Sequence, residues 1–430
     1  MAGSENLALD VIRKGFPHAD PADIDGALVV EQGWNILAED LPLPVAVIRQ
    51  SALMANRNAM MAYVREADAD LAPHGKTTMS PEIFRMQIED GAWAITISTV
   101  HQMRVALFSG VKRIIMANQV VSYQDMDYIV GRIAADDSLD FYCFIDSVDL
   151  VERWADVVSR HSLNRPIQFL LELGYPNGRT GCRTIEGALA VAKAISRHEA
   201  LSLRGVAGFE GLYQYLQADE AEYLVQKYLE FTAEVAVSID SENLFSVGQV
   251  ILTSGGSAFF DMVVNIYRKL LLSKSCRIVL RSGCYITHDS GIYEQHQPAR
   301  LSRNPPCGIS SPRLESALEI WAYIISIPEA GRAIIGAGRR DFGHDAGPPR
   351  VLKIFNPENQ AFRIICVDDL SIDSINDQHA HLTLPVGTKI SVGDMVALGV
   401  SHPCTTFDRW RTMFVVDDGY NVLSSVNTYF

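Results

Sequence analysis

The sequence has no hydrophobic run of about 18 residues, the minimum length for a membrane-spanning helix. Residues 1–15 also contain no apolar stretch of the kind that secretory signal peptides carry. From these two absences we expect a soluble protein that remains in the cytoplasm.

Cysteine and positive charge are both in short supply. The seven cysteines are odd in number, scattered and without a Cys-x-x-Cys pair, which excludes a zinc ribbon or dithiol redox motif and fits a reduced compartment. They are Cys143, Cys182, Cys276, Cys284, Cys307, Cys366 and Cys404. Lys and Arg total 37 against 51 Asp and Glu, so the net charge is −14. This charge repels phosphate backbones and anionic lipid, so we expect neither nucleic-acid nor membrane partners.

The composition is that of a folded protein with a large core. Apolar residues make up 48% of the 430 residues, and charged residues make up 20%. At roughly 150 residues per domain, this length fits two or three units, or one large barrel with a smaller domain. We take two domains as the starting prediction.

Predicted strands and helices alternate between about residues 45 and 285, the pattern of parallel βα units. Amphipathic segments such as Ala52–Glu66 and Asp149–Arg160 separate the strands. Nine strands are predicted: Val45–Arg49, Ala69–Pro73, Ala94–Ser98, Arg113–Ala117, Asp140–Ile145, Ile167–Leu173, Leu203–Phe209, Gln249–Ser254 and Arg277–Arg281. Because a closed (β/α)8 barrel uses eight, we assign the first strand elsewhere and begin the barrel near Ala69.

Past residue 315 the pattern changes to strands separated by Gly, Pro and Asp turns, which is typical of a mostly antiparallel β domain. The predicted strands are Ala317–Ile327, Arg332–Gly336, Arg350–Phe355, Phe362–Val367, His379–Leu384 and Asp394–Val400. We therefore predict an α/β fold with an N-terminal extension (1–40), a (β/α)8 TIM-type barrel (41–315) and a C-terminal β domain (316–430).

The segment Pro73–Thr77 places Lys76 where a barrel strand ends, at the rim that carries active sites in such barrels. A desolvated lysine amine, or one near other positive charge, can attack a carbonyl and hold it as a Schiff base. A surface lysine in a polar loop fits the pentapeptide equally well.

Two glycine-containing loops follow the seventh and eighth barrel strands, the recurrent phosphate site of these barrels. Glycines let backbone N–H groups approach an anion, hydroxyls add donors, and a following helix N-terminus adds positive dipole. The residues concerned are Ser254, Gly255, Gly256, Ser257, Gly283 and Tyr285. A pair of ordinary βα turns is the alternative.

Two further pairs could take part in chemistry. Glu172 and Arg179 lie near the end of the fifth barrel strand, where they could orient a cofactor ring or simply form a local ion pair. His402 and Cys404 end a strand of the second domain, and alternate strand residues share a face, so both could bind one ion, with zinc preferred. A buried thiol and a hydrogen-bonded histidine are the alternative. We assign structural roles to the remaining polar candidates, His101, His288, Cys307, His344 and Asp345.

Taken together, the lysine segment, the two glycine loops, Glu172 with Arg179, and the His-x-Cys pair resemble one family in this order along the chain. That family contains D-threonine aldolase and eukaryotic-type D-serine dehydratase, which are alanine-racemase-like, fold-type III pyridoxal-phosphate enzymes. The resemblance spans roughly residues 40 to 410. It also implies that the first strand joins the C-terminal β domain.

The resemblance implies a role for each of these residues. Lys76 would form the Schiff base with pyridoxal 5'-phosphate, the two loops would hold its phosphate, and Arg179 would lie near its ring oxygen. His402 and Cys404 would bind a divalent metal, most simply Zn²⁺. In the aldolase branch the second metal position is typically Asp, so a cysteine there favours the dehydratase branch.

The implied activity is elimination of water from a D-β-hydroxy amino acid of the D-serine, D-threonine or 3-hydroxy-D-aspartate type, giving a 2-oxo acid and ammonia. The alternative is retro-aldol cleavage to glycine and an aldehyde. A racemase fits less well, because it needs no metal and needs a second acid/base on the opposite face of the ring, for which the sequence offers no candidate. A non-catalytic pyridoxal-phosphate carrier also fits less well, because such carriers resemble the barrel alone and lack a β domain with its own His-x-Cys pair. The family also implies a head-to-tail homodimer.

Four stretches depart from the family pattern. Residues Gly208–Gly211 replace a segment in which relatives carry a histidine, and residues 377–379 read Asp-Gln-His in place of an acidic-acidic-His segment. The stretch Phe407–Arg411 and the leader of about 40 residues also differ. We therefore expect a distinct subfamily whose substrate need not be serine.

Overall fold

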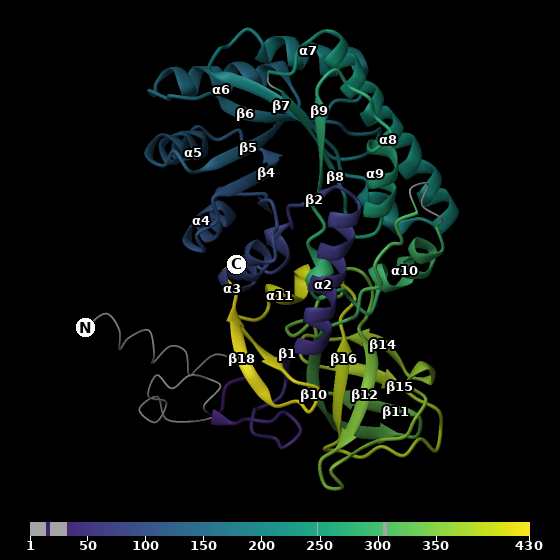
Figure 1. The fold of residues 1–430 in the computed structure, drawn as a ribbon. Helices are drawn as coiled ribbons and strands as arrows, with labels where there is room; N and C mark the ends of the chain where they lie inside the picture. Colours follow the sequence, from purple (N-terminus) through teal and green to yellow (C-terminus); the bar gives the residue numbers. More distant parts are fainter. Residues whose placement is uncertain (1–13, 18–31, 247, 304–307) are drawn as a thin grey trace, which may run out of the picture.

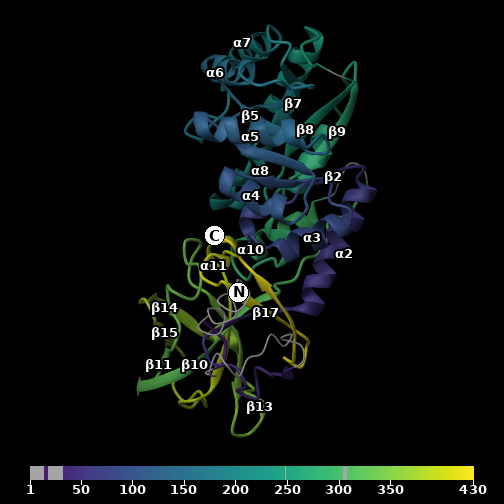
Figure 2. The same ribbon diagram turned by 90° about the vertical axis from the view of Figure 1, so that its left-hand side faces the viewer.

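The computed structural model describes residues 14–17, 32–246, 248–303 and 308–430. Most of the predicted N-terminal extension, and Cys307, lie outside these ranges. An α/β barrel and a mostly antiparallel sheet lie one above the other, and α2 (Gln50–Glu66) runs from the sheet to the barrel (Figures 1 and 2). No helix in the described ranges is long and apolar enough to cross a membrane.

The barrel consists of eight parallel strands in the spatial order β2-β9-β8-β7-β6-β5-β4-β3. Backbone hydrogen bonds from Trp93 N to Leu71 O (2.7 Å) and from Thr96 N to Pro73 O (2.9 Å) join the two ends of this order. The strands are β2 (Asp70–Leu71), β3 (Ile95–Ile97), β4 (Arg113–Gln119), β5 (Asp140–Ile145), β6 (Ile167–Glu172), β7 (Leu201–Ala207), β8 (Gln249–Ser254) and β9 (Ser275–Leu280). The predicted barrel and its start near residue 69 are thus confirmed.

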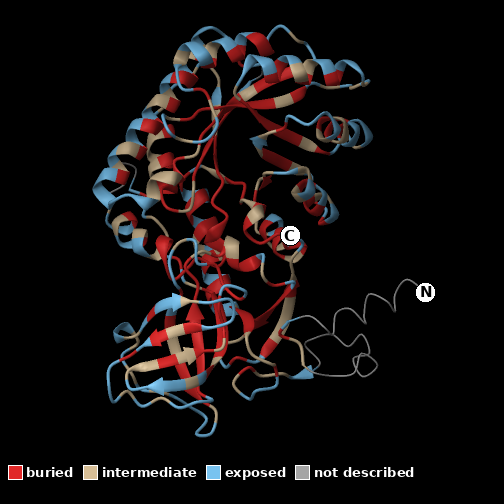
Figure 3. Ribbon diagram, turned by 180° about the vertical axis from the view of Figure 1, so that it is seen from behind, coloured by how far each residue is buried: buried red, intermediate tan, exposed pale blue. Residues whose placement is uncertain are grey.

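Helices cover the outside of the barrel, with their exposed faces outward and their apolar faces against the strands (Figure 3). They are α3 (Pro81–Glu89), α4 (Val100–Phe108), α5 (Tyr123–Ala135), α6 (Val148–Ser159), α7 (Ile185–Ile195), α8 (Ala218–Ser241) and α9 (Phe260–Tyr267). α10 (Ile292–Ser302) follows the last barrel strand. The amphipathic segments at 52–66 and 149–160 match α2 and α6 to within two residues.

The second sheet has ten strands, and β1 (Val45–Arg49) lies in its interior between β10 and β17. β1 pairs antiparallel with β10 (Leu318–Glu329) and parallel with β17 (Thr412–Val416), which confirms that the first predicted strand belongs to this domain. The other strands are β11 (Arg332–Ile335), β12 (Arg350–Asn356), β13 (Ala361–Phe362), β14 (Ser371–Ile375), β15 (Ala380–Thr383), β16 (Met395–Gly399) and β18 (Val422–Asn427).

The predicted strand Phe362–Val367 is largely wrong, because only β13 forms there and pairs with the end of β12. Ile364 is fully exposed and Val367 begins the short 3₁₀ turn η5 (Val367–Asp369), so the apolar residues of this stretch have no partner strand. The sequence reading also missed β14, β17 and β18. The strands β17 and β18 both follow the unfamiliar stretch Phe407–Arg411 in the chain.

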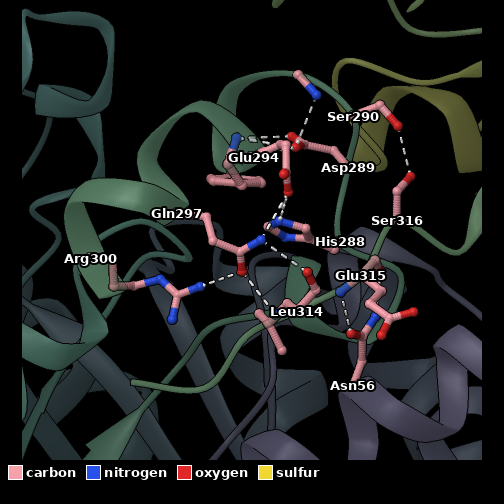
Figure 4. A network of polar contacts seen from close by, with 12 residues as sticks. Asn56, His288, Asp289, Ser290, Glu294, Gln297, Arg300, Leu314, Glu315 and Ser316 are labelled. Carbon is pink, nitrogen blue, oxygen red and sulfur yellow. Dashed lines mark hydrogen bonds and ion pairs between the residues drawn. The ribbon is translucent and has the colours of Figure 1, made fainter. Parts of the chain in front are cut away.

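A buried polar network surrounds the chain where it passes from barrel to sheet (Figure 4). The side chain of Asn56, on α2, accepts from the N–H of Glu315 (2.7 Å) and donates to its carbonyl oxygen (2.8 Å). The Asp289 carboxylate accepts from the N–H groups of Tyr293 (3.1 Å) and Glu294 (3.0 Å) at the start of α10. This network therefore fixes the connection that precedes the second sheet.

Candidate active site

One cavity of about 480 Å³ lies at the C-terminal rim of the barrel and is closed on one side by the β domain. Nine of the eleven residues singled out from the sequence line it, although they come from segments more than 300 residues apart. They are Lys76, Glu172, Arg179, Gly255, Gly256, Ser257, Gly283, His402 and Cys404. The buried Ser254 stands directly behind this lining, whereas Tyr285 does not face it.

Lys76 lies in the 3₁₀ turn η2 (Gly75–Thr77), which begins just after β2 ends. The turn packs so tightly that a Cβ at Gly75 would lie 2.7 Å from the Phe84 ring. Within the described part of the chain, no residue forms a hydrogen bond or ion pair with Nζ of Lys76. The amine therefore enters the cavity without a protein partner, as an amine that must react with a carbonyl should.

His74 lies beside Lys76 in the cavity wall. Its Nε2 is 3.2 Å from the hydroxyl of Ser98, while its Nδ1 is buried and has no hydrogen-bond partner. Burial, together with the positive charges of Lys76 and Arg281, lowers the pKa of His74 well below its ordinary value, so the ring is neutral. A buried ring nitrogen without a partner is costly, which indicates that a bound group completes this site.

The loop after β8 forms an anion cradle. Gly255 takes a φ of +103°, which only glycine adopts readily, and thereby aims successive N–H groups at one point. In this structure the carboxylate of Glu210 accepts hydrogen bonds there, from the N–H of Gly255 (3.1 Å) and of Gly256 (2.6 Å) and from the hydroxyl of Ser254 (3.1 Å). Contrary to the prediction, the loop does not open a helix directly, because α9 starts only at Phe260.

Glu172 and Arg179 do not pair with each other among the described residues. The Glu172 carboxylate accepts a short hydrogen bond from Gln119 Nε2, and burial raises the pKa of this carboxyl group. The guanidinium of Arg179 instead lies 4.4 Å from the centre of the Phe209 ring. Of the two sequence-based alternatives, the local ion pair is therefore wrong, and both side chains remain available to the cavity.

His402 and Cys404 lie together, but not on a strand as predicted. β16 ends at Gly399, and Pro403, which has no N–H for a strand ladder, turns the chain into the short helix α11 (Cys404–Phe407). A third donor joins them from the barrel: Cys284, in the 3₁₀ turn η4 (Cys284–Ile286), has its Sγ 3.5 Å from Sγ of Cys404. The donor atoms of all three residues lie within 4.8 Å of one another.

The electrostatics of this cluster favour a thiolate on Cys404 beside a protonated His402, an ion pair whose proton a metal ion would displace on binding. A hydrogen bond from Cys284, helped by His402, holds the pKa of the Cys404 thiol well below its usual range even though burial raises it. Burial lowers the pKa of His402, but contacts with Cys404 and Asp345 outweigh it and raise that pKa to about 9. Nδ1 of His402 lies 2.6 Å from Oδ2 of Asp345, which leaves Nε2 for a metal ion.

Tyr285 is a predicted site residue whose side chain does not line the cavity. Its ring is buried beside α2 and α3, where Arg57 and Asp90 act on it, and burial raises the pKa of its hydroxyl. Sequence reasoning in turn missed Cys284, Asp345 and Glu210 as site residues. In the sequence, only its position between two predicted phosphate-binding residues, Gly283 and Tyr285, indicated that Cys284 lies at the site.

Comparisons with known proteins agree with the two-part fold. The family model "Alanine racemase, N-terminal domain" matches residues 48–261, and the model "Putative serine dehydratase domain" matches residues 317–416. The chain is 24% identical to D-threonine aldolase of Arthrobacter sp. over 387 residues, which are 87% of this chain and 89% of that protein.

Solved structures are similar over nearly the whole chain. The crystal structure of D-threonine aldolase from Filomicrobium marinum aligns with a TM-score of 0.75 at 17% identity and covers 92% of this chain and 97% of its own. D-threo-3-hydroxyaspartate dehydratase from Delftia sp. HT23 aligns with a TM-score of 0.71 at 16% identity and covers 92% and 99%. A variant of this dehydratase with a cysteine replaced by alanine was solved in the metal-free form.

Proposed function

We propose that this chain, which belongs to the D-threonine aldolase and D-serine dehydratase family of alanine-racemase-like, fold-type III pyridoxal-phosphate enzymes, is a lyase for D-β-hydroxy amino acids. We further propose that it eliminates water, giving a 2-oxo acid and ammonia. The observation that carries this proposal is the partner-free amine of Lys76, which shares one cavity with an anion cradle and a Cys-His cluster.

The residues present fit pyridoxal 5'-phosphate. Lys76 would bind its aldehyde, the loop residues Ser254–Ser257 and Gly283 would hold its phosphate, and Arg179 would lie near its ring oxygen. The cradle already holds an anionic group, the Glu210 carboxylate, and the unpartnered Nδ1 of His74 supports a polar ligand beside Lys76. When bound, the cofactor supplies an electron sink for the negative charge that develops on the substrate's Cα.

Lys76 is the residue we assign to the proton on Cα. Its amine lies at the rim of the barrel with no competing hydrogen bond, so it can take up that proton once the substrate amine has replaced it. His74 stays neutral beside it, because burial and nearby positive charge oppose its protonation. A neutral His74 does not repel a protonated Lys76, and it keeps one ring nitrogen for a bound group.

The Cys-His cluster fits a divalent metal, and its thiol and imidazole donors favour Zn²⁺ over Mg²⁺ or Ca²⁺. His402 and Cys404 would hold the ion, and Asp345 would fix the tautomer of His402. Such an ion would supply a Lewis acid toward a substrate oxygen, which would ease the departure of the β-hydroxyl group. Overall, the substrate loses the Cα proton and the Cβ hydroxyl as water, and hydrolysis of the enamine then releases ammonia.

Retro-aldol cleavage to glycine and an aldehyde is the second candidate, because a curated relative and a structural neighbour are D-threonine aldolases. We favour dehydration because Cys404 stands where the aldolase branch typically has Asp. The metal-free cysteine variant of the related dehydratase supports a thiol ligand in that branch.

The test is a product analysis with D-serine, D-threonine and 3-hydroxy-D-aspartate, using the L-enantiomers as matched controls. We expect a 2-oxo acid and ammonia from at least one D-substrate, and a chelator should suppress their release. Glycine plus an aldehyde would instead move the chain to the aldolase branch. No product of either kind, from a protein that binds the cofactor, would refute the lyase assignment.

Family membership also supports a head-to-tail homodimer with each barrel facing the partner's β domain, and the scattered cysteines support a cytoplasmic location. We expect sedimentation equilibrium to give the mass of two chains. A mass of 47.5 kDa, that of one chain, would refute the dimer.

A further inference from the structure

The Cys-His cluster contains one donor more than the pair recognised in the sequence. Cys284 comes from the barrel, directly after Gly283, whereas His402 and Cys404 come from the β domain. Cys284 and Cys404 are 120 residues apart in the chain, yet both line the same cavity as Lys76. The cluster therefore connects the two domains at the active site.

The spacing of the two sulfur atoms matches shared coordination of one ion. Two thiolates bound to one tetrahedral zinc, each at about 2.3 Å and about 109° apart, lie about 3.8 Å from each other. The observed separation of Cys284 Sγ and Cys404 Sγ is 3.5 Å. A disulfide would require about 2.05 Å. The two sulfur atoms are therefore spaced like two ligands of one zinc ion, and a movement of a few tenths of an ångström would give the tetrahedral separation.

Each of the three donors also has an outer partner, a feature of functional metal sites. His402 is held by Asp345, and Cys404 lies 3.4 Å from the hydroxyl of Thr77, the residue next to Lys76. The hydroxyl of Tyr293, at the start of α10, contacts Cys284. The metal cluster and the lysine are therefore linked through adjacent residues of η2.

Backbone contacts hold the barrel segment that carries Cys284 against the β-domain segment that carries His402 and Cys404. Ser290 N donates to Val400 O (2.9 Å), which joins the segment after Cys284 to the segment before His402. Next to this bond, a Cβ at Gly291 would lie only 2.6 Å from Cα of Ser401. Asp289, part of the network in Figure 4, fixes Tyr293 through its backbone N–H. Such support is what precise ligand placement requires.

We propose that Cys284, His402 and Cys404 together bind one Zn²⁺ ion as a Cys₂His site with a single open position. This inference rests on the proposed function and extends it, because the sequence assigned only two ligands. Three protein ligands and one open position form the pattern of catalytic zinc, and alcohol dehydrogenase uses this donor set on a hydroxyl oxygen. With one open position, the ion would bind a single substrate oxygen, that of the β-hydroxyl, without chelating the carboxylate as well.

The test compares Cys284→Ser with wild type, kept reduced and without oxygen so that no disulfide forms. Zn²⁺ affinity is measured by competition with a chromophoric chelator, and Co²⁺ is then bound in place of zinc. The near-ultraviolet thiolate-to-cobalt band should fall by roughly half as two thiolates become one. Zinc affinity should fall by more than the about 10- to 100-fold that loss of an outer-shell partner causes.

Two further variants make the test specific. Cys276→Ser changes a partly buried cysteine at the other end of the last barrel strand and should leave both readouts at wild-type values. Cys284→Asp offers a carboxylate ligand, so it should restore much of the zinc affinity but not the lost cobalt band. The absorbance band of the bound cofactor confirms that each variant is folded.

Unchanged zinc affinity and an unchanged cobalt band in Cys284→Ser would overturn the inference. If Cys404→Ala still lost the metal, the two-ligand site of the proposed function would stand. A wild-type protein that binds neither ion would overturn the metal site in both forms, and the product analysis above would then decide the lyase assignment separately.

Discussion

The carboxylate of Glu210 accepts a 2.6 Å hydrogen bond from the backbone N–H of Gly256, in the loop assigned to the cofactor's phosphate. Glu210 is fully buried and also bonds the N–H of Gly255. Two anions cannot share these donors at low cost, because burial without compensation penalises the second charge. Glu210 therefore competes with any phosphate that enters the cradle.

Replacing Glu210 with Gln should strengthen binding of inorganic phosphate and of pyridoxal phosphate by about tenfold, which corresponds to about 1.4 kcal/mol. The neutral amide removes the repulsion while keeping the size of the side chain. Equilibrium dialysis gives both dissociation constants. Glu220→Gln, at an exposed position in the first turn of α8, is the matched control and should change neither. Weaker phosphate binding in Glu210→Gln would contradict this role.

Replacing Cys404 with Ala should leave the absorbance band of the bound cofactor intact while turnover falls to background. The cofactor is held by Lys76 and the loops, whereas Cys404 belongs to the metal cluster. Spectra and product assays on one preparation check both parts. A metal-free variant with full activity would remove the metal from the mechanism.

Replacing Asp345 with Asn should weaken Zn²⁺ binding by about 10- to 100-fold, because the carboxylate that orients His402 is lost. Chelator competition measures this change. Asp373→Asn, an exposed change on β14, serves as the control. Equal zinc affinity in wild type and Asp345→Asn would show that Asp345 does not position His402.

His74 should make the protein without cofactor less stable as the pH falls. Because the pKa of His74 is lowered in the folded state, the unfolded chain binds more protons below the ordinary value of 6.5. The free energy of unfolding therefore decreases as pH drops from about 7.5 to about 5.5, and His74→Gln should reduce that decrease. Urea titrations at both pH values provide the comparison. An identical decrease in the variant would mean that His74 is charged in the folded protein.

The sequence was sufficient to predict features that depend on chain order. Counting nine strands for an eight-stranded barrel removed Val45–Arg49 from the barrel. The family resemblance assigned it to the second sheet, where it pairs with β10 and β17. Lys76 and the loop at Gly255 could be brought together because the C-terminal ends of parallel strands meet at one rim.

Features that depend on how the two domains pack could not be predicted. Cys284 meets Cys404 only because the segment after β9 lies against the end of β16, and no spacing rule encodes that contact. Asp345 and Glu210 are similar cases, since each acts on a residue distant in sequence. Tyr285 faces away from the cavity because neighbouring residues of a 3₁₀ turn point to different sides.

The central claim is that Lys76 carries the cofactor, and one measurement tests it most directly. The protein is incubated with pyridoxal phosphate and reduced with borohydride, which converts an imine to a stable secondary amine, and its peptides are mapped by mass spectrometry. We predict that the cofactor mass lies on the peptide containing Lys76 and is absent from Lys76→Ala. A label on another lysine, or no label in wild type, would contradict the account.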